Sequence, residues 1–202
     1  MKKIIKKIIY SILSKYITNK GKKGAIYLTF DDGPHPENTL KILETLEKFD
    51  VKATFFMTGS EMEKYPEVVK SVVKKGHSIG YHSYSHISYK KLPLAEIRKE
   101  LSIAQSLAKK ANIKINLFRP PYGDLTPVSF FYLMLTGWKT IMWSLDSRDS
   151  FDSRDRVLET VDVNKVSEGD ILLFHDDYQM TLEILPEVLE KYSANNVSCR
   201  EL

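Results

Sequence analysis

The sequence predicts an α/β fold, an irregular (β/α) barrel of the TIM-barrel type with about seven strand–helix units. From residue 25 onward, short apolar runs alternate with stretches of helical period, which indicates parallel strands joined by right-handed crossovers. Polar or charged residues directly follow at least five of the apolar runs. In a parallel barrel the ends of all strands surround one rim, whereas an open sheet gathers mainly the residues beside its switch point. The barrel is therefore favoured.

The strands are predicted from short apolar runs that are bounded by turn residues. Because parallel strands in a barrel are covered on both faces, such runs need no alternation of polar and apolar residues. The predicted strands cover residues 25–30, 52–57, 77–81, 115–118, 140–145, 170–174 and, with a weaker pattern, 196–199.

The helices are predicted from apolar residues at threefold and fourfold spacing, as in Leu43 and Leu46. Three prolines, Pro66, Pro127 and Pro186, are expected in first turns, where the missing backbone N–H costs nothing. The predicted helices cover residues 38–49, 66–75, 95–111, 127–136, 154–165 and 182–192.

Length and composition indicate one globular domain. The chain has 202 residues, of which 43% are hydrophobic and 28% are charged. A chain of this length buries roughly 70% of the surface that its unfolded form exposes, so it needs no disulfide or structural metal in order to fold. The single cysteine, Cys199, has no internal partner and indicates nothing about an oxidising compartment.

The charge is unevenly distributed along the chain. Eight of the 30 basic residues and none of the 26 acidic residues lie in the first 23 positions, which leaves a net charge of −4 for the rest. Nucleic-acid binding requires a basic face on the folded domain, and the body of this chain is mildly acidic. No nucleic-acid partner is therefore expected.

Residues 1–23 are expected to form a basic amphipathic N-terminal helix or extension, ahead of a catalytic domain at residues 24–202. Apolar residues recur there at helical spacing, with lysines between them. Two interpretations stay open: peripheral contact of residues 1–20 with an anionic membrane, or a helix packed across the end of the domain. A secretion signal is less favoured because Lys6 and Lys7 interrupt the apolar run, and a membrane span requires about 20 apolar residues.

The first motif with chemical potential is TFDDGP, from Thr29 to Pro34. Asp31 and Asp32 follow an apolar strand and point in different directions, so one carboxylate can bind a cation while the other accepts a proton. Gly33 and Pro34 then turn the chain. The structural alternative is a simple turn in which an aspartate caps the next helix.

The second motif is HSYSH, which contains His82 and His86. Two imidazoles four residues apart can bind the same metal ion, and with a carboxylate they form a three-ligand site that leaves a position for water. The sequence therefore predicts a metal site made of these two histidines and one of the two adjacent aspartates. His77 is expected to be structural because it lies inside a strand, and His35 is left unassigned.

Two further residues follow predicted strands. Arg119, in FRPPYG, can orient a carboxylate through a forked hydrogen bond, although a surface arginine before a proline turn is the simpler interpretation. His175, in ILLFHD, can donate a proton to a leaving amine if a carboxylate stabilises its protonated form. Taken alone, His175 would be interpreted as a satisfied core histidine.

In order, TFDDGP, HSYSH, RPPYG, DSRD and LFH resemble the five motifs of the polysaccharide deacetylase family. This family, related to nodulation protein B and also called carbohydrate esterase family four, includes chitin, chitooligosaccharide and peptidoglycan N-acetylglucosamine deacetylases. The resemblance extends from about residue 25 to the C-terminus. It implies an irregular barrel with fewer than eight strand–helix units.

The resemblance also implies a role for each matching residue. Asp31 would be the general base, positioned by Arg119, and His175 the general acid, supported by Asp149. The backbone around Tyr122 would help to hold the acetyl oxygen, and Leu173 would form a wall of the acetyl pocket. The implied metal ligands are Asp32, His82 and His86.

One position departs from the family pattern. Family members commonly have tryptophan after the second aspartate of the fourth motif, where this chain has Ser150. We expect a change in the shape of the pocket, with Trp143 as the candidate to supply the missing aromatic wall.

The resemblance implies hydrolysis of an N-acetyl group from a sugar or polysaccharide, with release of acetate. The expected cofactor is a divalent metal, Zn²⁺ in the first place, with Co²⁺, Ni²⁺ or Mn²⁺ as alternatives. The expected substrate is an N-acetylated glycan or a lipid-linked sugar. The alternatives are the same site acting on an O-acetyl ester or another small amide, and a non-catalytic glycan-binding barrel. A bacterial-type cell is expected, with the protein in the cytoplasm or peripheral at the inner membrane, and no oligomeric state is predicted.

Overall fold

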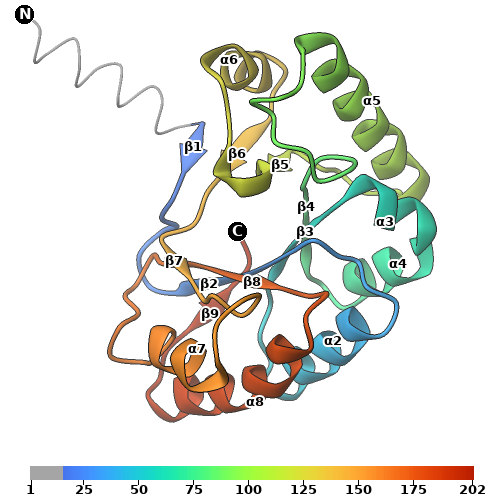
Figure 1. The fold of residues 1–202 in the computed structure, drawn as a ribbon. Helices are drawn as coiled ribbons and strands as arrows, with labels where there is room; N and C mark the ends of the chain where they lie inside the picture. Colours follow the sequence, from blue (N-terminus) through green and yellow to red (C-terminus); the bar gives the residue numbers. More distant parts are fainter. Residues whose placement is uncertain (1–15) are drawn as a thin grey trace, which may run out of the picture.

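The computed structural model describes residues 16–202 and shows one curled sheet surrounded by helices (Figure 1). Along the sheet the strand order is β1-β6-β5-β4-β3-β2-β8-β7, and β9 pairs with β2. All these pairs are parallel. The strands are β1 (Ile17–Thr18), β2 (Ile26–Asp31), β3 (Thr54–Met57), β4 (Ser78–Tyr81), β5 (Leu117–Phe118), β6 (Lys139–Ile141), β7 (Leu145–Asp146), β8 (Ile171–His175) and β9 (Cys199–Arg200).

The helices lie outside the curled sheet, as right-handed crossovers between parallel strands require (Figure 1). They are α2 (Asn38–Lys48), α3 (Gly59–Lys64), α4 (Pro66–Lys74), α5 (Leu94–Ala111), the 3₁₀ helix η1 (Pro121–Gly123), α6 (Pro127–Leu135), α7 (Arg154–Thr160) and α8 (Gln179–Ala194). Within the described residues β1 and β7 are the two ends of the strand order. The predicted fold class, an irregular (β/α) barrel, is confirmed.

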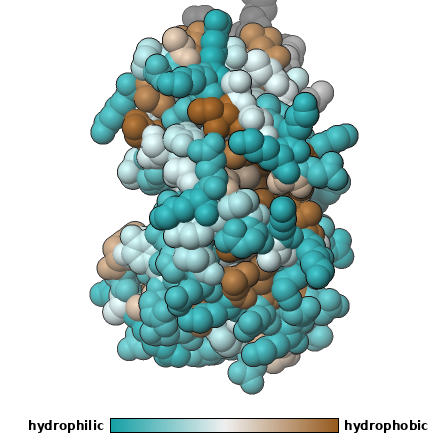
Figure 2. Space-filling model, turned by 90° about the vertical axis from the view of Figure 1, so that its right-hand side faces the viewer, coloured by the Kyte–Doolittle hydropathy of each residue, from teal (hydrophilic) through white to brown (hydrophobic). Residues whose placement is uncertain are grey.

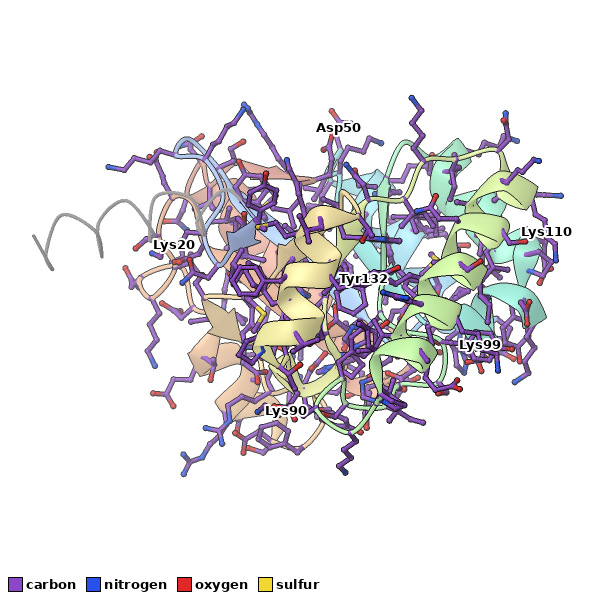
Figure 3. All side chains as sticks on the ribbon, turned by 90° about the horizontal axis from the view of Figure 1, so that it is seen from above. Lys20, Asp50, Lys90, Lys99, Lys110 and Tyr132 are labelled. Carbon is purple, nitrogen blue, oxygen red and sulfur yellow. The ribbon has the colours of Figure 1, made fainter. Side chains whose placement is uncertain are left out.

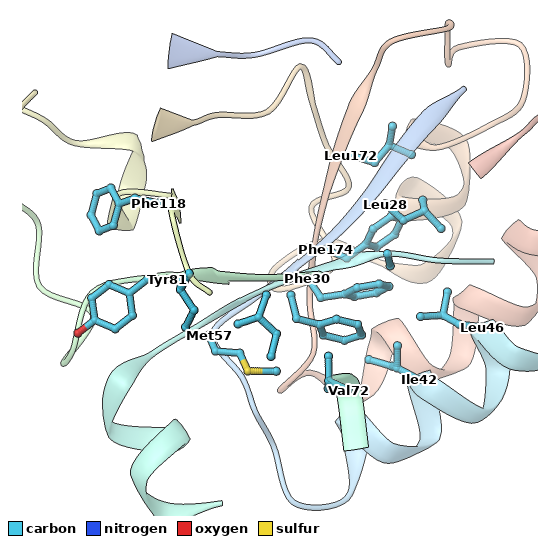
Figure 4. Packing of buried hydrophobic residues seen from close by; sticks show 14 of the residues in the cluster. Leu28, Phe30, Ile42, Leu46, Met57, Val72, Tyr81, Phe118, Leu172 and Phe174 are labelled. Carbon is cyan, nitrogen blue, oxygen red and sulfur yellow. The ribbon is translucent and has the colours of Figure 1, made fainter. Parts of the chain in front are cut away.

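The core lies between the sheet and the helices. Every residue of β2 is buried, and Phe30 stacks on Phe55 of β3 with ring centroids 5.0 Å apart. Ile42 and Leu46 of α2 pack against this layer in the same cluster (Figure 4). Because β2 is buried along its whole length and flanked by β3 and β8, the residues at its end are held on a rigid support.

The predicted strand at residues 140–145 is in fact two strands, β6 and β7. Met142 N–H donates to Thr18 O (2.7 Å), and Ser144 N–H donates to Ile171 O (3.0 Å). The chain therefore changes its neighbouring strand between these residues, from β1 to β8. Pairing with two distant partners is a tertiary effect that an apolar run does not reveal.

Three helix predictions differ from the structure. The six-residue helix α3 was not predicted, because a segment this short has no measurable apolar period. Helix α7 ends at Thr160, earlier than expected. Pro186 was expected in a first turn, which is wrong: α8 begins at Gln179, so the proline lies in its interior and the helix loses one backbone hydrogen bond there. Pro66 and Pro127 do begin their helices.

The expected N-terminal extension shares its last residues with the sheet. Ile17 and Thr18 pair with Thr140 and Ile141 of β6. Lys20 forms an ion pair with Asp170 (2.9 Å). The predicted amphipathic helix otherwise falls on residues 1–15, which lie outside the described residues. In the described part of the chain, no helix is long and apolar enough to cross a bilayer.

Candidate active site

The rim at the carboxyl ends of the strands brings Asp31, at the end of β2, against Arg119, which follows β5. Arg119 Nη1 donates to Asp31 Oδ1 (2.7 Å) and to Thr29 Oγ1 (2.8 Å). The remaining guanidinium nitrogens donate to the carbonyl oxygens of Ile141 and Met142. The guanidinium is fully buried, with the Phe56 ring 4.1 Å from its central carbon. Asp31 is therefore held in one orientation by a buried cation.

The pKa of Asp31 reflects two opposing effects. Burial raises the pKa of this carboxyl, and the charge of Arg119 acts in the opposite direction, with a net rise above the ordinary value. Since Arg119 binds Oδ1, the second oxygen, Oδ2, is left to face His82, whose Nε2 lies 3.7 Å away. A carboxylate with a raised pKa and one free oxygen is suited to accept a proton.

Asp32, His82 and His86 converge beside Asp31. Asp32 Oδ1 lies 3.2 Å from His86 Nε2 and 3.5 Å from His82 Nε2. One ligand atom from each of these residues lies within 4.8 Å of the other two. The spacing seen in the sequence therefore produces a compact cluster of one carboxylate and two imidazoles.

This cluster fits a divalent cation. The Nδ1 of His82 donates to the carbonyl oxygen of Arg119 (2.7 Å), which leaves Nε2 as the nitrogen with a free lone pair. Burial lowers the pKa of His82 to about 3, so the imidazole is neutral at physiological pH, as a metal ligand must be. Asp32 Oδ1 is buried and accepts no hydrogen bond from the described residues. Lone-pair atoms that have no hydrogen-bond donor and that face the same point are typical metal ligands.

His175 lies at the end of β8, directly beside Asp31 in the strand register. Its Nδ1 donates to Asp149 Oδ1 (2.7 Å), and its backbone N–H donates to Asp149 Oδ2 (2.8 Å). Thr181, on α8, also donates to Asp149 Oδ2. Burial lowers the pKa of His175, but the hydrogen bond and charge of Asp149 outweigh this and raise the pKa to about 9. The imidazole is therefore a cationic acid at neutral pH.

The loops that carry these groups adopt uncommon backbone conformations. Five non-glycine residues of the rim have positive φ: Asp32 (76°), Ser83 (65°), His86 (55°), Tyr122 (60°) and Arg148 (67°). Such conformations are costly for residues with a Cβ and gather at functional sites. The turn after Asp32 also requires glycine, because a Cβ on Gly33 would lie 2.1 Å from Asp176 Oδ2.

Comparison with known proteins gives the family. Residues 18–140, more than half of the chain, match the family model described as polysaccharide deacetylase. The chain belongs to the polysaccharide deacetylase family. It is 31% identical over 180 residues to the peptidoglycan-N-acetylmuramic acid deacetylase PdaC of Bacillus subtilis, a match that covers 89% of this chain and 38% of that protein. The chain thus spans about two fifths of the length of this relative.

Solved structures of family members share the fold. A peptidoglycan N-acetylglucosamine deacetylase superposes with a TM-score of 0.87 at 28% identity, covering 96% of this chain and 94% of the other. A Bacillus anthracis protein described as a pseudoenzyme of carbohydrate esterase family 4 superposes with a TM-score of 0.85 at 29% identity, covering 92% and 67%. Similarity in fold therefore covers both active members of the family and an inactive one.

The predicted wall residues of this family member lie around the cluster. The Tyr122 ring contacts the His86 ring edge to face, with centroids 4.7 Å apart. Trp143 lies 5.8 Å from the Arg119 guanidinium, and its ring would be 3.2 Å from a Cβ at Gly123. Leu173 is buried in β8, in register with Thr29. Trp143 therefore lies beside the Tyr122 turn, and its role as the aromatic wall that compensates for Ser150 stays a prediction.

A polar groove opens beside the metal-ligand cluster. Asp177, which the sequence analysis missed, lines it, and burial raises the pKa of this carboxyl to about 6. His35, left unassigned from the sequence, accepts from the backbone N–H of Asn38 and so holds the start of α2. The described residues that line the groove are Asp32, Pro34, His35, Thr58, Ser60, Glu61, Ser85, His86 and Asp177.

Other supporting residues were also missed. Thr29 and Thr181 hold Arg119 and Asp149, and Asp176 accepts a hydrogen bond from Thr39 (2.5 Å) beneath the Gly33 turn. Burial raises the pKa of Asp176 to about 8, so this carboxyl is largely protonated at neutral pH. Only the position of Asp176 next to His175 in the sequence could have indicated a role.

Proposed function

We propose that the protein is a metal-dependent hydrolase that removes N-acetyl groups from an N-acetylated sugar or polysaccharide and releases acetate. The observation that carries the proposal is the convergence of three groups at one rim: the Arg119-bound carboxylate Asp31, the ligand set Asp32–His82–His86, and the Asp149-bound imidazole His175. Family membership supports it, because related proteins are described as deacetylases.

The proposed cofactor is a divalent cation held by Asp32, His82 and His86, with Zn²⁺ favoured over Co²⁺, Ni²⁺ and Mn²⁺. A bound cation of this kind polarises the amide carbonyl and acidifies water. The chain supplies a neutral nitrogen ligand in His82, since burial keeps the pKa of this imidazole low, and one buried carboxylate oxygen of Asp32 that accepts no hydrogen bond from the described residues.

Asp31 acts as the base and His175 as the acid. Asp31 Oδ2 takes a proton from the attacking water, whose oxygen adds to the acetyl carbon. His175 is protonated on both nitrogens at neutral pH, and because Nδ1 is bound to Asp149, Nε2–H is the proton available to the amine. When the C–N bond breaks, that proton moves to the nitrogen, and acetate and a free amino sugar result.

Two alternatives belong to other classes of activity. The same site can hydrolyse an O-acetyl ester or another small amide, since the proposed machinery recognises the acetyl carbonyl. A non-catalytic glycan-binding barrel is the second alternative, and one related protein, from Bacillus anthracis, is described as a pseudoenzyme. Against that role, Asp31, Arg119, Asp149 and His175 are all present and paired in this chain.

We also propose a substrate that is an N-acetylated glycan or a lipid-linked sugar, and a location in a bacterial-type cell, in the cytoplasm or peripheral at the inner membrane. The lysine-rich segment at residues 1–20 supports contact with an anionic membrane. Secretion is the alternative location.

The experiment is acetate release from defined sugars by the full chain loaded with Zn²⁺. N-acetylated oligosaccharides, lipid-linked N-acetyl sugars and O-acetylated sugars are compared, with Asp31→Asn as the catalytic control and Asp155→Asn, on the exposed side of α7, as the matched control. Release from N-acetyl substrates by the wild type and by Asp155→Asn, but not by Asp31→Asn, is expected. Release from O-acetyl sugars alone, or equal release by Asp31→Asn, contradicts the proposal.

A further inference from the structure

Helix α6 is the unusual helix on the surface of the described fold. Its nine residues, from Pro127 to Leu135, include no charged residue. One face packs inward through Phe130 and Leu133, while Val128, Phe131 and Leu135, at spacings of three and four residues, are 61%, 50% and 79% exposed. A helix that is apolar all round is normally covered on every side. These three exposed residues, Val128, Phe131 and Leu135, define the exposed face of α6. We expect a partner to cover this face.

Helices α3, α4 and α5 lie on a surface that differs from that of α6. The side of the molecule that carries α3, α4 and α5 is largely hydrophilic, with separate apolar areas between charged side chains (Figure 2). In the view from above, α6 lies uppermost, with Tyr132 on its side toward α5 and Lys20 on the other side of the helix (Figure 3). The exposed apolar face is thus a local feature of α6.

The N-terminal segment joins the fold beside the end of α6. Tyr16 O accepts from Thr140 N–H (2.8 Å), and β1 runs parallel to β6, which begins four residues after α6 ends. Tyr16 and Ile17 therefore lie beside the start of β6, at the end of the strands where α6 ends. The 15 residues ahead of Tyr16 include five lysines and no acid, and Lys20, Lys22 and Lys23 follow as exposed cations.

We propose that the exposed face of α6, together with the cations that border it, binds an anionic lipid bilayer. Apolar side chains that can enter the acyl region fit this partner, and so do Arg98 and Lys139, which can pair with anionic headgroups. The lysine-rich sequence ahead of Tyr16 adds positive charge to the same chain. The lysine-rich segment itself is a poor occupant of the α6 face, because cations already border that face. Arg98 lies 5.1 Å over the Tyr132 ring of α6, and Lys139 is exposed just beyond its end.

The orientation on the bilayer has a consequence that rests on the proposed function. Helix α6 begins four residues after Gly123 of the rim, and the neighbouring Tyr122 contacts His86. Because α6 runs from the rim back to the opposite end of the strands, a molecule bound through α6 lies on its side. The rim then opens at the lipid surface, within reach of a sugar that is held there.

The first test is co-sedimentation of the full chain with vesicles of phosphatidylcholine and phosphatidylglycerol in equal parts, compared with pure phosphatidylcholine. The double variant Phe131→Ser/Leu135→Ser is expected to bind the anionic vesicles at least about tenfold more weakly than the wild type. The matched control, Leu40→Ser/Val73→Ser, alters two other apolar residues, each 37% exposed, and is expected to bind normally. Equal binding by both variants overturns the proposal.

The second test asks what covers α6. In a Cys199→Ser background, an environment-sensitive fluorophore is attached to the cysteine of Leu135→Cys. Its emission is expected to shift to the blue only when anionic vesicles are added, whereas the emission of the same label on Leu40→Cys is not expected to shift. A blue shift at position 135 without vesicles shows that the chain covers its own helix and overturns the proposal. Acetate release from a soluble N-acetyl sugar is measured on each variant, and since α6 carries no catalytic residue it is expected to be unchanged. Failure of the proposed reaction in the wild type is thereby separated from failure of membrane binding.

Discussion

At the scale of the residue, Arg119 connects the proposed base, Asp31, with the candidate metal ligand His82. Its guanidinium binds Asp31, and its carbonyl oxygen accepts from His82, so one buried residue orients two functional groups. The ion pair is shielded from water on all sides, and Thr29 binds the same nitrogen as the carboxylate. Loss of either member therefore leaves an uncompensated buried charge.

Arg119→Met is expected to lower the free energy of unfolding by about 3–5 kcal/mol, because it leaves Asp31 buried without its cation. Urea unfolding measures this loss, with Arg156→Met, an exposed arginine of α7, as the control that changes little. In the double variant Asp31→Asn/Arg119→Met the losses should be less than additive. Additive losses would show that the two residues do not interact.

The pH dependence of turnover tests the role of His175. Its pKa of about 9 depends on Asp149, and its protonated form is the proposed acid, so activity is expected to fall as the pH rises through about 9. In Asp149→Asn the raising effect is lost, and this alkaline limb is expected to move toward the ordinary histidine pKa of about 6.5. Initial rates of acetate release across pH measure the shift. An unmoved alkaline limb in Asp149→Asn would assign it to another group.

Sequence patterns identified the residues that carry the proposed chemistry but not those that position them. Asp31, Asp32, His82 and His86 follow strands at characteristic spacings, so their convergence could be predicted from topology. The supporting roles of Thr29 and Thr181 could not be predicted, because threonine is common in any sequence and their partners are 90 and 32 residues away. Such pairs exist only because particular strands and helices lie side by side.

At the scale of the element, the segment between β5 and β6 does most to shape the site. Its 3₁₀ turn places Tyr122 over His86, and α6 follows at once. Thr126 and Ser129 form a capping box at the start of α6, in which each side chain accepts from the backbone N–H of the other residue. This cap fixes the direction in which α6 leaves the rim.

Removal of the cap is expected to weaken the fold modestly. Thr126→Ala should lower the free energy of unfolding by about 1 kcal/mol, because the backbone N–H of Ser129 loses its side-chain acceptor. Thr160→Ala is the matched control, since the Thr160 hydroxyl bonds only to Arg156 O at an exposed helix end. Urea titration compares them, and an equal effect of the two changes would argue against the cap.

Element boundaries were predictable where local chemistry sets them. Pro66 and Pro127 mark helix starts, as their missing N–H predicts. The start of α8 was not predictable, because the residues ahead of Leu182 lack an apolar period. These residues are placed by packing, which includes the hydrogen bond from Thr181 to Asp149. The break between β6 and β7 has the same kind of cause, a change of partner strand.

At the scale of the whole molecule, the parallel strands bring residues from distant parts of the sequence to one rim. Asp31, His82, Arg119 and His175 follow β2, β4, β5 and β8, whose ends meet on the same side of the curled sheet. The alternation of strands and helices was enough to predict this. The lateral order of the strands, with β2 between β3 and β8, depends on long-range pairing and was not predictable from the sequence pattern.

Metal stoichiometry tests the central claim, that Asp32, His82 and His86 hold a divalent cation beside a free base. Elemental analysis after dialysis against Zn²⁺ is done on the wild type, Asp31→Asn, His82→Ala and, as a matched control, His77→Ala. We predict that the wild type, Asp31→Asn and His77→Ala each retain one ion per chain, and that His82→Ala retains none. Full occupancy in His82→Ala, or no ion in the wild type, would contradict the account.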